Sequence, residues 1–235
     1  MKFLLTSAGI ANESIRAALV DLLGKPIAEC RAVCIPTASL ALSSGVSDTW
    51  WTLKLLDLGW AEYGTIELTA LPTLPEECWL PALEAADCVL VGGGNNGYLS
   101  YWMQESGLAP RLPELLREKV YVGVSAGSMI ATHSLQIDRD YLERTGIYRD
   151  ADFEEDAPRG AGSDRTLGLL PFVIRPHLGA DYFPTATAER FAQSAAALTV
   201  PLYAIDDQTA IKVVDGAVEV VSEGEWQRFE GGVAG

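Results

Sequence analysis

The arrangement best suited to chemistry in this sequence is a serine between two glycines, in the run Gly123-Val124-Ser125-Ala126-Gly127. An apolar stretch precedes the run and a helical pattern follows it, which is the strand–turn–helix context of a nucleophile elbow. Glycines flank such a serine because the turn is tight and larger side chains would clash with nearby backbone. The amide of Ala126, at the start of the helix, would donate to a developing oxyanion. The pattern therefore predicts nucleophilic catalysis by Ser125.

A serine hydroxyl is a weak nucleophile that needs a base, and the chain has only two histidines. His133 lies eight residues after Ser125 in the same predicted helix, which puts it roughly 12 Å along the helix axis. His177 ends a predicted strand over 173–177. Active sites of parallel α/β sheets lie at the carboxyl ends of the strands. His177 is therefore the predicted base.

The base needs a carboxylate that holds its tautomer and stabilises the imidazolium. Spacing alone does not choose this acid. The candidates between serine and histidine are Asp138, Asp140, Glu143, Asp150 and Asp152, and those after a later strand are Asp206 and Asp207.

A second glycine-rich turn, Gly92-Gly93-Gly94-Asn95, follows another buried strand. It lacks both the G-x-G-x-x-G spacing and the lysine of phosphate-binding loops. We expect an amide of Gly93 or Gly94 to complete an oxyanion hole with Ala126, the alternative being a purely structural turn.

The elements that must position these residues alternate between strand and helix. Strands are predicted at 2–5, 32–35, 63–68, 87–91, 120–124, 173–177 and 202–205, and a hairpin at 210–214 and 217–221. Helices are predicted after Asn12 and at 47–58, 97–105, 110–118 and 186–198. This order predicts one α/β domain over 1–235, with a mostly parallel sheet covered by helices on both faces. The segment 138–165 is expected to be an active-site loop, and 231–235 a frayed tail.

Bulk composition excludes several classes of protein. About half of the 235 residues are hydrophobic, which disfavours disorder. The net charge is −15, which disfavours nucleic-acid binding. No apolar run approaches a membrane span, and the N-terminus lacks a secretory apolar region. The four cysteines form no C-x-x-C pair. We expect a cytoplasmic protein with free thiols and neither metal nor other cofactor.

Three segments together resemble the peptidase E (aspartyl dipeptidase) family of serine peptidases, which includes cyanophycinases. They are the Val-Gly-Gly-Gly-Asn turn at 91–95, the Ser-Ala-Gly elbow at 125–127, and Pro176-His177 after a long loop. The resemblance implies a fold like that of class I glutamine amidotransferases. It also implies hydrolysis of dipeptides or short peptides through a triad and an acyl-enzyme.

The resemblance carries several site residues onto this chain. The family's third glycine, an oxyanion donor, corresponds to Gly94. The triad acid of the dipeptidases lies fifteen residues after the serine, which is Asp140 here, with Asp138 and Glu143 as alternatives. An acidic segment beside the site in cyanophycinase-like members corresponds to Asp207.

The substrate-recognition residues depart from the aspartyl dipeptidases. Their Thr-Arg-Glu run is Thr187-Ala188-Glu189 here, without the arginine, and their Asn-Pro-His has Arg175 in place of asparagine. Strict specificity for aspartate is therefore not expected. Arg175 would either supply the positive charge or pair with the acidic loop. The candidate substrate-binding residues are Asn95, Arg175 and Asp207. A homodimer is a further expectation.

Two other classes of protein remain as alternatives, an α/β-hydrolase esterase and a non-catalytic peptide-binding relative. An amidotransferase is excluded because the elbow holds Ser125 instead of cysteine, and Gly179 stands where its glutamate would follow the histidine.

Overall fold

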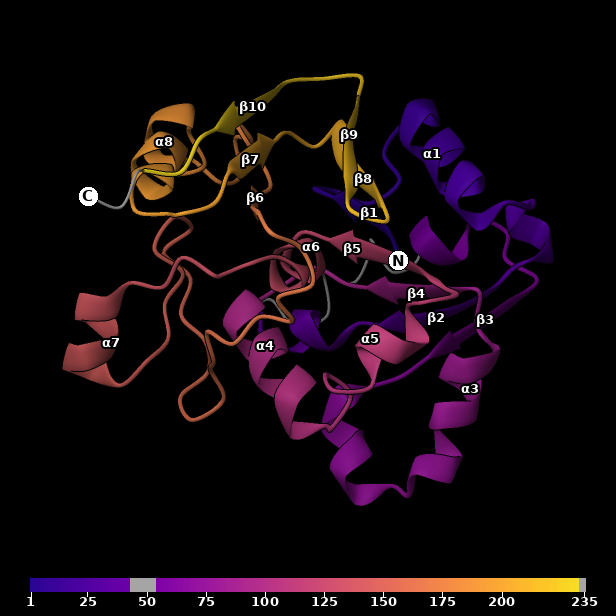
Figure 1. Ribbon diagram of the computed structural model, residues 1–235. Coiled ribbons are helices and arrows are strands. Elements are labelled where there is room, and N and C mark those ends of the chain that lie inside the picture. The colour runs from indigo at the N-terminus through magenta and orange to yellow at the C-terminus, as the bar shows by residue number, and fades with distance from the viewer. Residues whose placement is uncertain (43–53, 233–235) are drawn as a thin grey trace.

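The computed structural model of this chain describes residues 1–42 and 54–232 (Figure 1). The strands are β1 (Lys2–Thr6), β2 (Arg31–Ile35), β3 (Glu62–Thr65), β4 (Cys88–Val91), β5 (Val120–Val124), β6 (Val173–Arg175), β7 (Leu202–Ile205), β8 (Thr209–Val214), β9 (Ala217–Ser222) and β10 (Trp226–Phe229). The α-helices are α1 (Glu13–Leu23), α3 (Leu80–Ala85), α4 (Asn96–Glu105), α5 (Leu112–Leu115), α6 (Ala126–Ala131), α7 (Arg139–Thr145) and α8 (Ala188–Ala196). Short 3-10 helices are η1 (Ile27–Glu29), η2 (Thr37–Ala41), η4 (Leu68–Thr73) and η5 (Glu76–Cys78). Within the described ranges, no helix has the length and apolar character needed to cross a membrane.

The main sheet has seven strands in the order β3-β2-β4-β5-β1-β8-β9. The first five are parallel, while β8 pairs antiparallel with β1 and β9 antiparallel with β8. The mostly parallel sheet and the C-terminal hairpin predicted from the sequence are thus confirmed. Because parallel strands end at the same edge, the segments that follow β1, β4 and β5 meet there.

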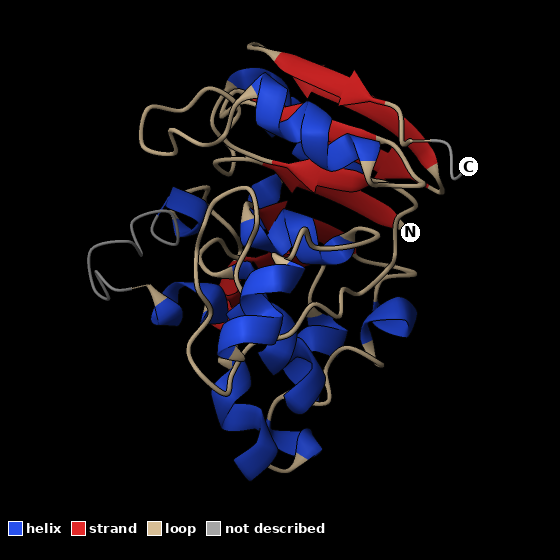
Figure 2. Ribbon diagram, turned by 90° about the vertical axis from the view of Figure 1, so that its left-hand side faces the viewer, coloured by secondary structure: helices blue, strands red, loops and turns tan. Residues whose placement is uncertain are grey.

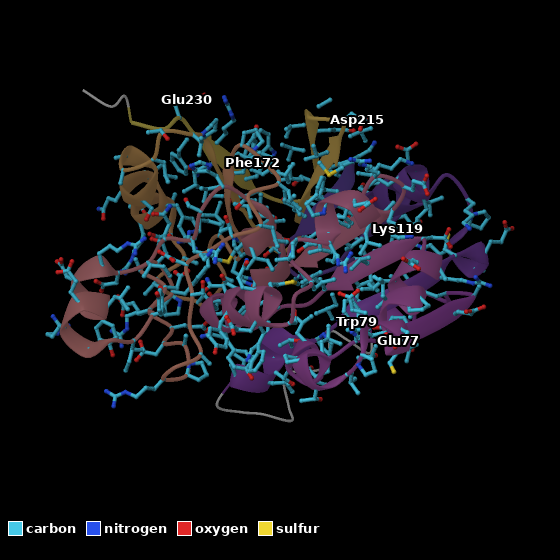
Figure 3. All side chains as sticks on the ribbon, turned by 60° about the horizontal axis from the view of Figure 1, so that its bottom comes forward. Glu77, Trp79, Lys119, Phe172, Asp215 and Glu230 are labelled. Carbon is cyan, nitrogen blue, oxygen red and sulfur yellow. The ribbon has the colours of Figure 1, made fainter. Side chains whose placement is uncertain are left out.

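Helices cover both faces of this sheet, and the alternation along β4 shows why. Val89 and Val91 point into the larger apolar cluster, with α4 and α5, while Cys88 and Leu90 point into the cluster beneath α1. Strands buried on both faces read as continuous apolar runs, as β4 does. Trp79 and Phe172, labelled in Figure 3, both belong to the larger cluster.

A second, three-stranded sheet has the order β10-β7-β6, with β6 parallel and β10 antiparallel to β7. Helix α8 lies against this sheet (Figure 2). Its Phe191 and Ala195 share an apolar cluster with Val173 of β6 and with Leu202 and Ala204 of β7. The sequence predicts β6 and β7 as strands but neither β10 nor their separation from the main sheet. This division matters for the site because β5 lies in one sheet and β6 in the other.

Other expectations differ from the structure in detail. The helix expected at 110–118 is only the single turn α5, whose Pro113 stands in the first turn. The segment 138–165 is not wholly a loop, because α7 forms within it, capped by Asp138. The helix expected at 47–58 lies mostly outside the described residues, and the chain is helical at 54–56. Of the expected frayed tail, 233–235 also lies outside them, and the Gly232 amide donates to the Ala195 carbonyl at 3.3 Å.

Candidate active site

Ser125 lies at the sharp turn between β5 and α6, with a backbone φ of 47° and ψ of −109°. Few residues other than glycine adopt such a conformation, and nucleophile elbows are one place where it occurs. A Cβ atom added at Gly123 would lie 2.6 Å from a backbone nitrogen of α6, and one at Gly127 would lie 2.0 Å from a carbonyl oxygen of β4. The crowding expected at both glycines is therefore present.

His177 follows β6 and reaches across to the nucleophile from the second sheet. Its Nε2 atom lies 2.9 Å from Oγ of Ser125, which is hydrogen-bonding distance. His177 is 6% exposed and also has a positive φ, 63°. The structure thus brings together the predicted nucleophile and base. His133 is exposed and lies beside Phe172, to whose carbonyl its backbone amide donates.

The other ring nitrogen of His177 meets Asp207, which follows β7. Nδ1 lies 2.8 Å from Oδ1 of Asp207. Burial by itself would raise the pKa of Asp207, but hydrogen bonds from His177, Ser7 and Tyr182 outweigh it and lower the pKa to about 2. Asp207 is therefore ionised at neutral pH, as an orienting acid must be.

The glycine-rich turn after β4 lies against the nucleophile. A Cβ atom added at Gly93 would come within 3.3 Å of the Ser125 Cβ, and Gly94 has a φ of 133°. Within the described residues, no acceptor is paired with the amides of Gly93, Gly94 or Ala126. Donors without a partner beside a nucleophile are suited to binding an oxyanion.

Comparison with known proteins agrees with this geometry. The model of peptidase family S51 matches residues 3–221 of the chain. This chain belongs to peptidase family S51.

Curated relatives named peptidase E support the assignment of this S51 chain as a serine peptidase. One from Streptomyces coelicolor is 36% identical over 99 residues, which span 42% of this chain and 35% of that protein. One from Shewanella putrefaciens is 26% identical across 81% of this chain and 74% of its own length. One from Shewanella denitrificans is 25% identical across 97% of this chain and 90% of its own length.

Solved structures share the fold of the S51 chain. A Listeria monocytogenes EGD-e protein, titled as a candidate peptidase E, superposes with a TM-score of 0.69 at 20% identity, covering 95% of this chain and 98% of its own. A peptidase from an acI-B1 actinobacterium gives a TM-score of 0.60 at 18% identity, and the match covers 98% of this chain and 94% of that peptidase. These likenesses confirm the class I glutamine amidotransferase-like fold.

In the structure of this S51 peptidase, a residue other than the expected Asp140 lies at Nδ1 of His177. Asp140 is exposed on the first turn of α7, and the carboxylate at Nδ1 of His177 belongs to Asp207 instead. The alternatives Asp138 and Glu143 also lie at α7, the first as its N-cap. The resemblance placed the acid by counting along the chain, and that count fails here because α7 carries the segment away from the histidine.

Arg175 is buried and pairs with two carboxylates of the segment 138–165. Its side chain is 0% exposed, with Nη1 2.9 Å from Oδ2 of Asp150 and Nε 2.6 Å from Oδ2 of Asp152. Of the two roles left open by the sequence, the structure therefore shows pairing with the acidic loop. Asn95 is also engaged, because its Oδ1 caps α4 and its Nδ2 donates to the Asp156 carbonyl at 3.0 Å.

Sequence reasoning missed four residues around the imidazole, one of them Phe183, whose ring centroid lies 5.0 Å from that of His177. Ser7, directly after β1, lies 3.1 Å from Nδ1 through its Oγ, and the Tyr182 hydroxyl lies 3.0 Å from the same atom. The Phe153 ring centroid is 6.3 Å from that of His177. The strand-end rule that indicated His177 could have indicated Ser7, since both follow a strand. No sequence signal marks Tyr182 or Phe153.

Proposed function

We propose that this serine peptidase hydrolyses dipeptides or short peptides through an acyl-enzyme on Ser125, with His177 as base and Asp207 as orienting acid. The observation that carries the proposal is the continuous chain of contacts, 2.9 Å from Ser125 Oγ to His177 Nε2 and 2.8 Å from His177 Nδ1 to Asp207. A nucleophile, its base and an ionised orienter within hydrogen-bond reach define the serine-hydrolase triad geometrically, whatever the fold.

The first half-reaction forms an ester. His177 Nε2 accepts the hydroxyl proton of Ser125 as Oγ bonds to the substrate carbonyl carbon. The carbonyl oxygen becomes an oxyanion, which the amides of Gly94 and Ala126 bind. When the tetrahedral intermediate collapses, the C–N bond breaks and His177 transfers its proton to the leaving amine.

The second half-reaction releases the acid. Water takes the place of the amine and gives a proton to His177 as its oxygen bonds to the acyl carbon. Collapse then breaks the bond to Ser125 Oγ, which regains its proton from His177. Asp207 stays ionised throughout and stabilises the imidazolium in both halves.

The surroundings of the base favour small substrates. His177 is nearly buried, and its ring lies 5.0 Å from that of Phe183 and 5.5 Å from that of Tyr182. A cavity of about 270 Å³ adjoins the site, between the turn at 8–11, Val124 and Asp207.

The same surroundings favour broad side-chain selectivity. Arg175 is buried and forms ion pairs with two buried carboxylates, and Arg190 pairs with Glu154 at 3.0 Å. Neither arginine is therefore available, as placed, to select an acidic side chain.

A panel of substrates tests the proposal. Dipeptides with acidic, neutral and basic first residues, longer peptides and p-nitrophenyl esters are incubated with the wild type and Ser125→Ala. We expect turnover of several dipeptides by the wild type and none by the variant. Ester cleavage without dipeptide turnover would instead indicate an esterase, and no turnover of any substrate would indicate a non-catalytic binding protein.

A further inference from the structure

Ser7 is a fully buried hydroxyl at the junction of the two sheets. It follows β1 in the main sheet, whereas His177 and Asp207 follow β6 and β7 in the second sheet. Its Oγ lies within hydrogen-bond distance of three atoms, the His177 backbone nitrogen at 2.9 Å, Nδ1 of the same histidine at 3.1 Å, and Oδ1 of Asp207 at 2.6 Å.

The hydrogens available around Nδ1 determine which atom donates and which accepts in each hydrogen bond. The backbone nitrogen of His177 can only donate, so Ser7 Oγ accepts there. The carboxylate of Asp207 can only accept, so the single proton of Ser7 points to it. The Tyr182 hydroxyl likewise donates its one proton to Oδ2 of Asp207. Toward Nδ1, Ser7 and Tyr182 can therefore act only as acceptors.

All three neighbours of Nδ1 are thus acceptors, and the hydrogen of the neutral imidazole must lie on Nδ1. Nε2 is left with its lone pair directed at Ser125. A histidine with the opposite tautomer cannot take the serine proton, and enzymes with a wrongly held tautomer lose about 10⁴ in kcat. A water molecule in place of Ser7 would be free to donate a hydrogen bond to Nδ1, so it would not act only as an acceptor there.

Ser7 also holds the backbone of the base. His177 has a φ of 63°, a strained conformation for a non-glycine residue that persists only where its surroundings impose it. The bond from its amide to Ser7 Oγ fixes this turn against the main sheet, which carries Ser125. Ser7 therefore links the sheet of the nucleophile to the sheet of the base.

We propose that Ser7 is a positioning residue that holds His177 in place relative to Ser125 and, together with Asp207, keeps the imidazole hydrogen on Nδ1. The proposal rests on the function proposed above for Ser125, His177 and Asp207. It assigns to one hydroxyl the link between the two sheets, which neither the nucleophile nor the acid provides.

The test compares Ser7→Ala with Ser100→Ala. Ser100 is also a fully buried serine, whose Oγ donates to the Arg165 carbonyl at 2.6 Å, in α4 and without a bond to the triad. Both variants lose one buried hydroxyl, so Ser100→Ala reports the general cost of that loss. We expect Ser7→Ala to lower kcat about tenfold or more with KM within about twofold, and Ser100→Ala to leave both unchanged.

The deciding readout is the ¹⁵N NMR spectrum of the free enzyme, at a pH where the imidazole is neutral. The chain has only two histidines, so His133→Asn leaves the signals of His177 alone. We expect a protonated Nδ1 and an unprotonated Nε2 in the wild type. In Ser7→Ala we expect the same tautomer, because Asp207 still accepts from Nδ1, but shifted ring signals of His177, because its backbone is no longer held against the main sheet. Ser100→Ala should leave these signals in place.

Several results would overturn the proposal. A wild-type His177 with its hydrogen on Nε2 does so without any substitution, even if Ser7→Ala fails to fold. Unshifted ring signals of His177 in Ser7→Ala also do so, whether or not kcat falls. A kcat of Ser7→Ala equal to that of Ser100→Ala does so as well. Failure of the proposed function shows separately, as undiminished peptide turnover by Ser125→Ala.

Discussion

Nδ1 of His177 lies 2.8 Å from Oδ1 of Asp207, a residue that follows the next strand of the second sheet. The base and its acid are thus carried by neighbouring parallel strands, while the nucleophile comes from the main sheet. This pairing predicts opposite results for two conservative substitutions. Asp207→Asn should lower kcat by about 10⁴, because the amide both loses the charge and can donate toward Nδ1. Asp140→Asn should leave kcat unchanged. Steady-state kinetics on one dipeptide checks both, and the reverse ranking would place the acid on α7.

A methyl group at Gly94 should impair catalysis without unfolding the protein. The added Cβ would lie 2.3 Å from the Ala38 carbonyl oxygen, so the turn and its amide must shift. Loss of one oxyanion donor costs about 10²–10³ in kcat. Gly107→Ala is the matched control, since Gly107 also has a positive φ but nothing within 4 Å of its added Cβ. Equal kcat values for the two alanine variants would remove Gly94 from the oxyanion hole.

Arg175→Met should act on stability. The substitution leaves Asp150 and Asp152 buried without their guanidinium partner, and breaking a buried ion pair in this way costs about 3–5 kcal/mol. Arg139→Met removes an exposed pair with Asp164 and should cost less than about 1 kcal/mol. Urea unfolding followed by tryptophan fluorescence measures both. A raised KM with unchanged stability would instead make Arg175 a substrate-binding residue.

Glu155 should destabilise the folded protein at alkaline pH. Burial, and secondarily the nearby charge of Asp150, raises the pKa of Glu155 to about 7. Because the folded form holds this proton more tightly than the unfolded form, stability falls as pH rises from about 4.5 to 7. Glu155→Gln carries no such charge, so it should be more stable than the wild type at pH 8, by on the order of 3 kcal/mol at most. Unfolding at pH 4 should show no difference, and a constant difference at both pH values would contradict the raised pKa.

The meeting of Ser125 and His177 was predictable because local patterns mark both residues. Each ends an apolar strand, and parallel strands bring their carboxyl ends to one edge. The strands themselves follow from apolar runs bounded by turn residues, and the Asp215-Gly216 hairpin from its turn chemistry.

The acid was not predictable, because its identity depends on tertiary pairing. Seven carboxylates satisfied the spacing, and only the pairing of β6 with β7 selects Asp207. The burial of Arg175 likewise depends on how the segment around Asp150 folds back, which no local pattern encodes. Ser7 stands in an ordinary strand end and acquires its contacts only when the two sheets meet.

Covalent labelling tests the central claim, that the triad activates Ser125. The wild type and Ser125→Ala are treated with a fluorophosphonate, and the adduct is located by mass spectrometry of the digested protein. We expect one adduct per chain on the peptide that contains Ser125, no adduct on the variant, and much slower labelling of Asp207→Asn. A wild type that takes up no label, or a Ser125→Ala variant labelled as fast as the wild type, would contradict the claim.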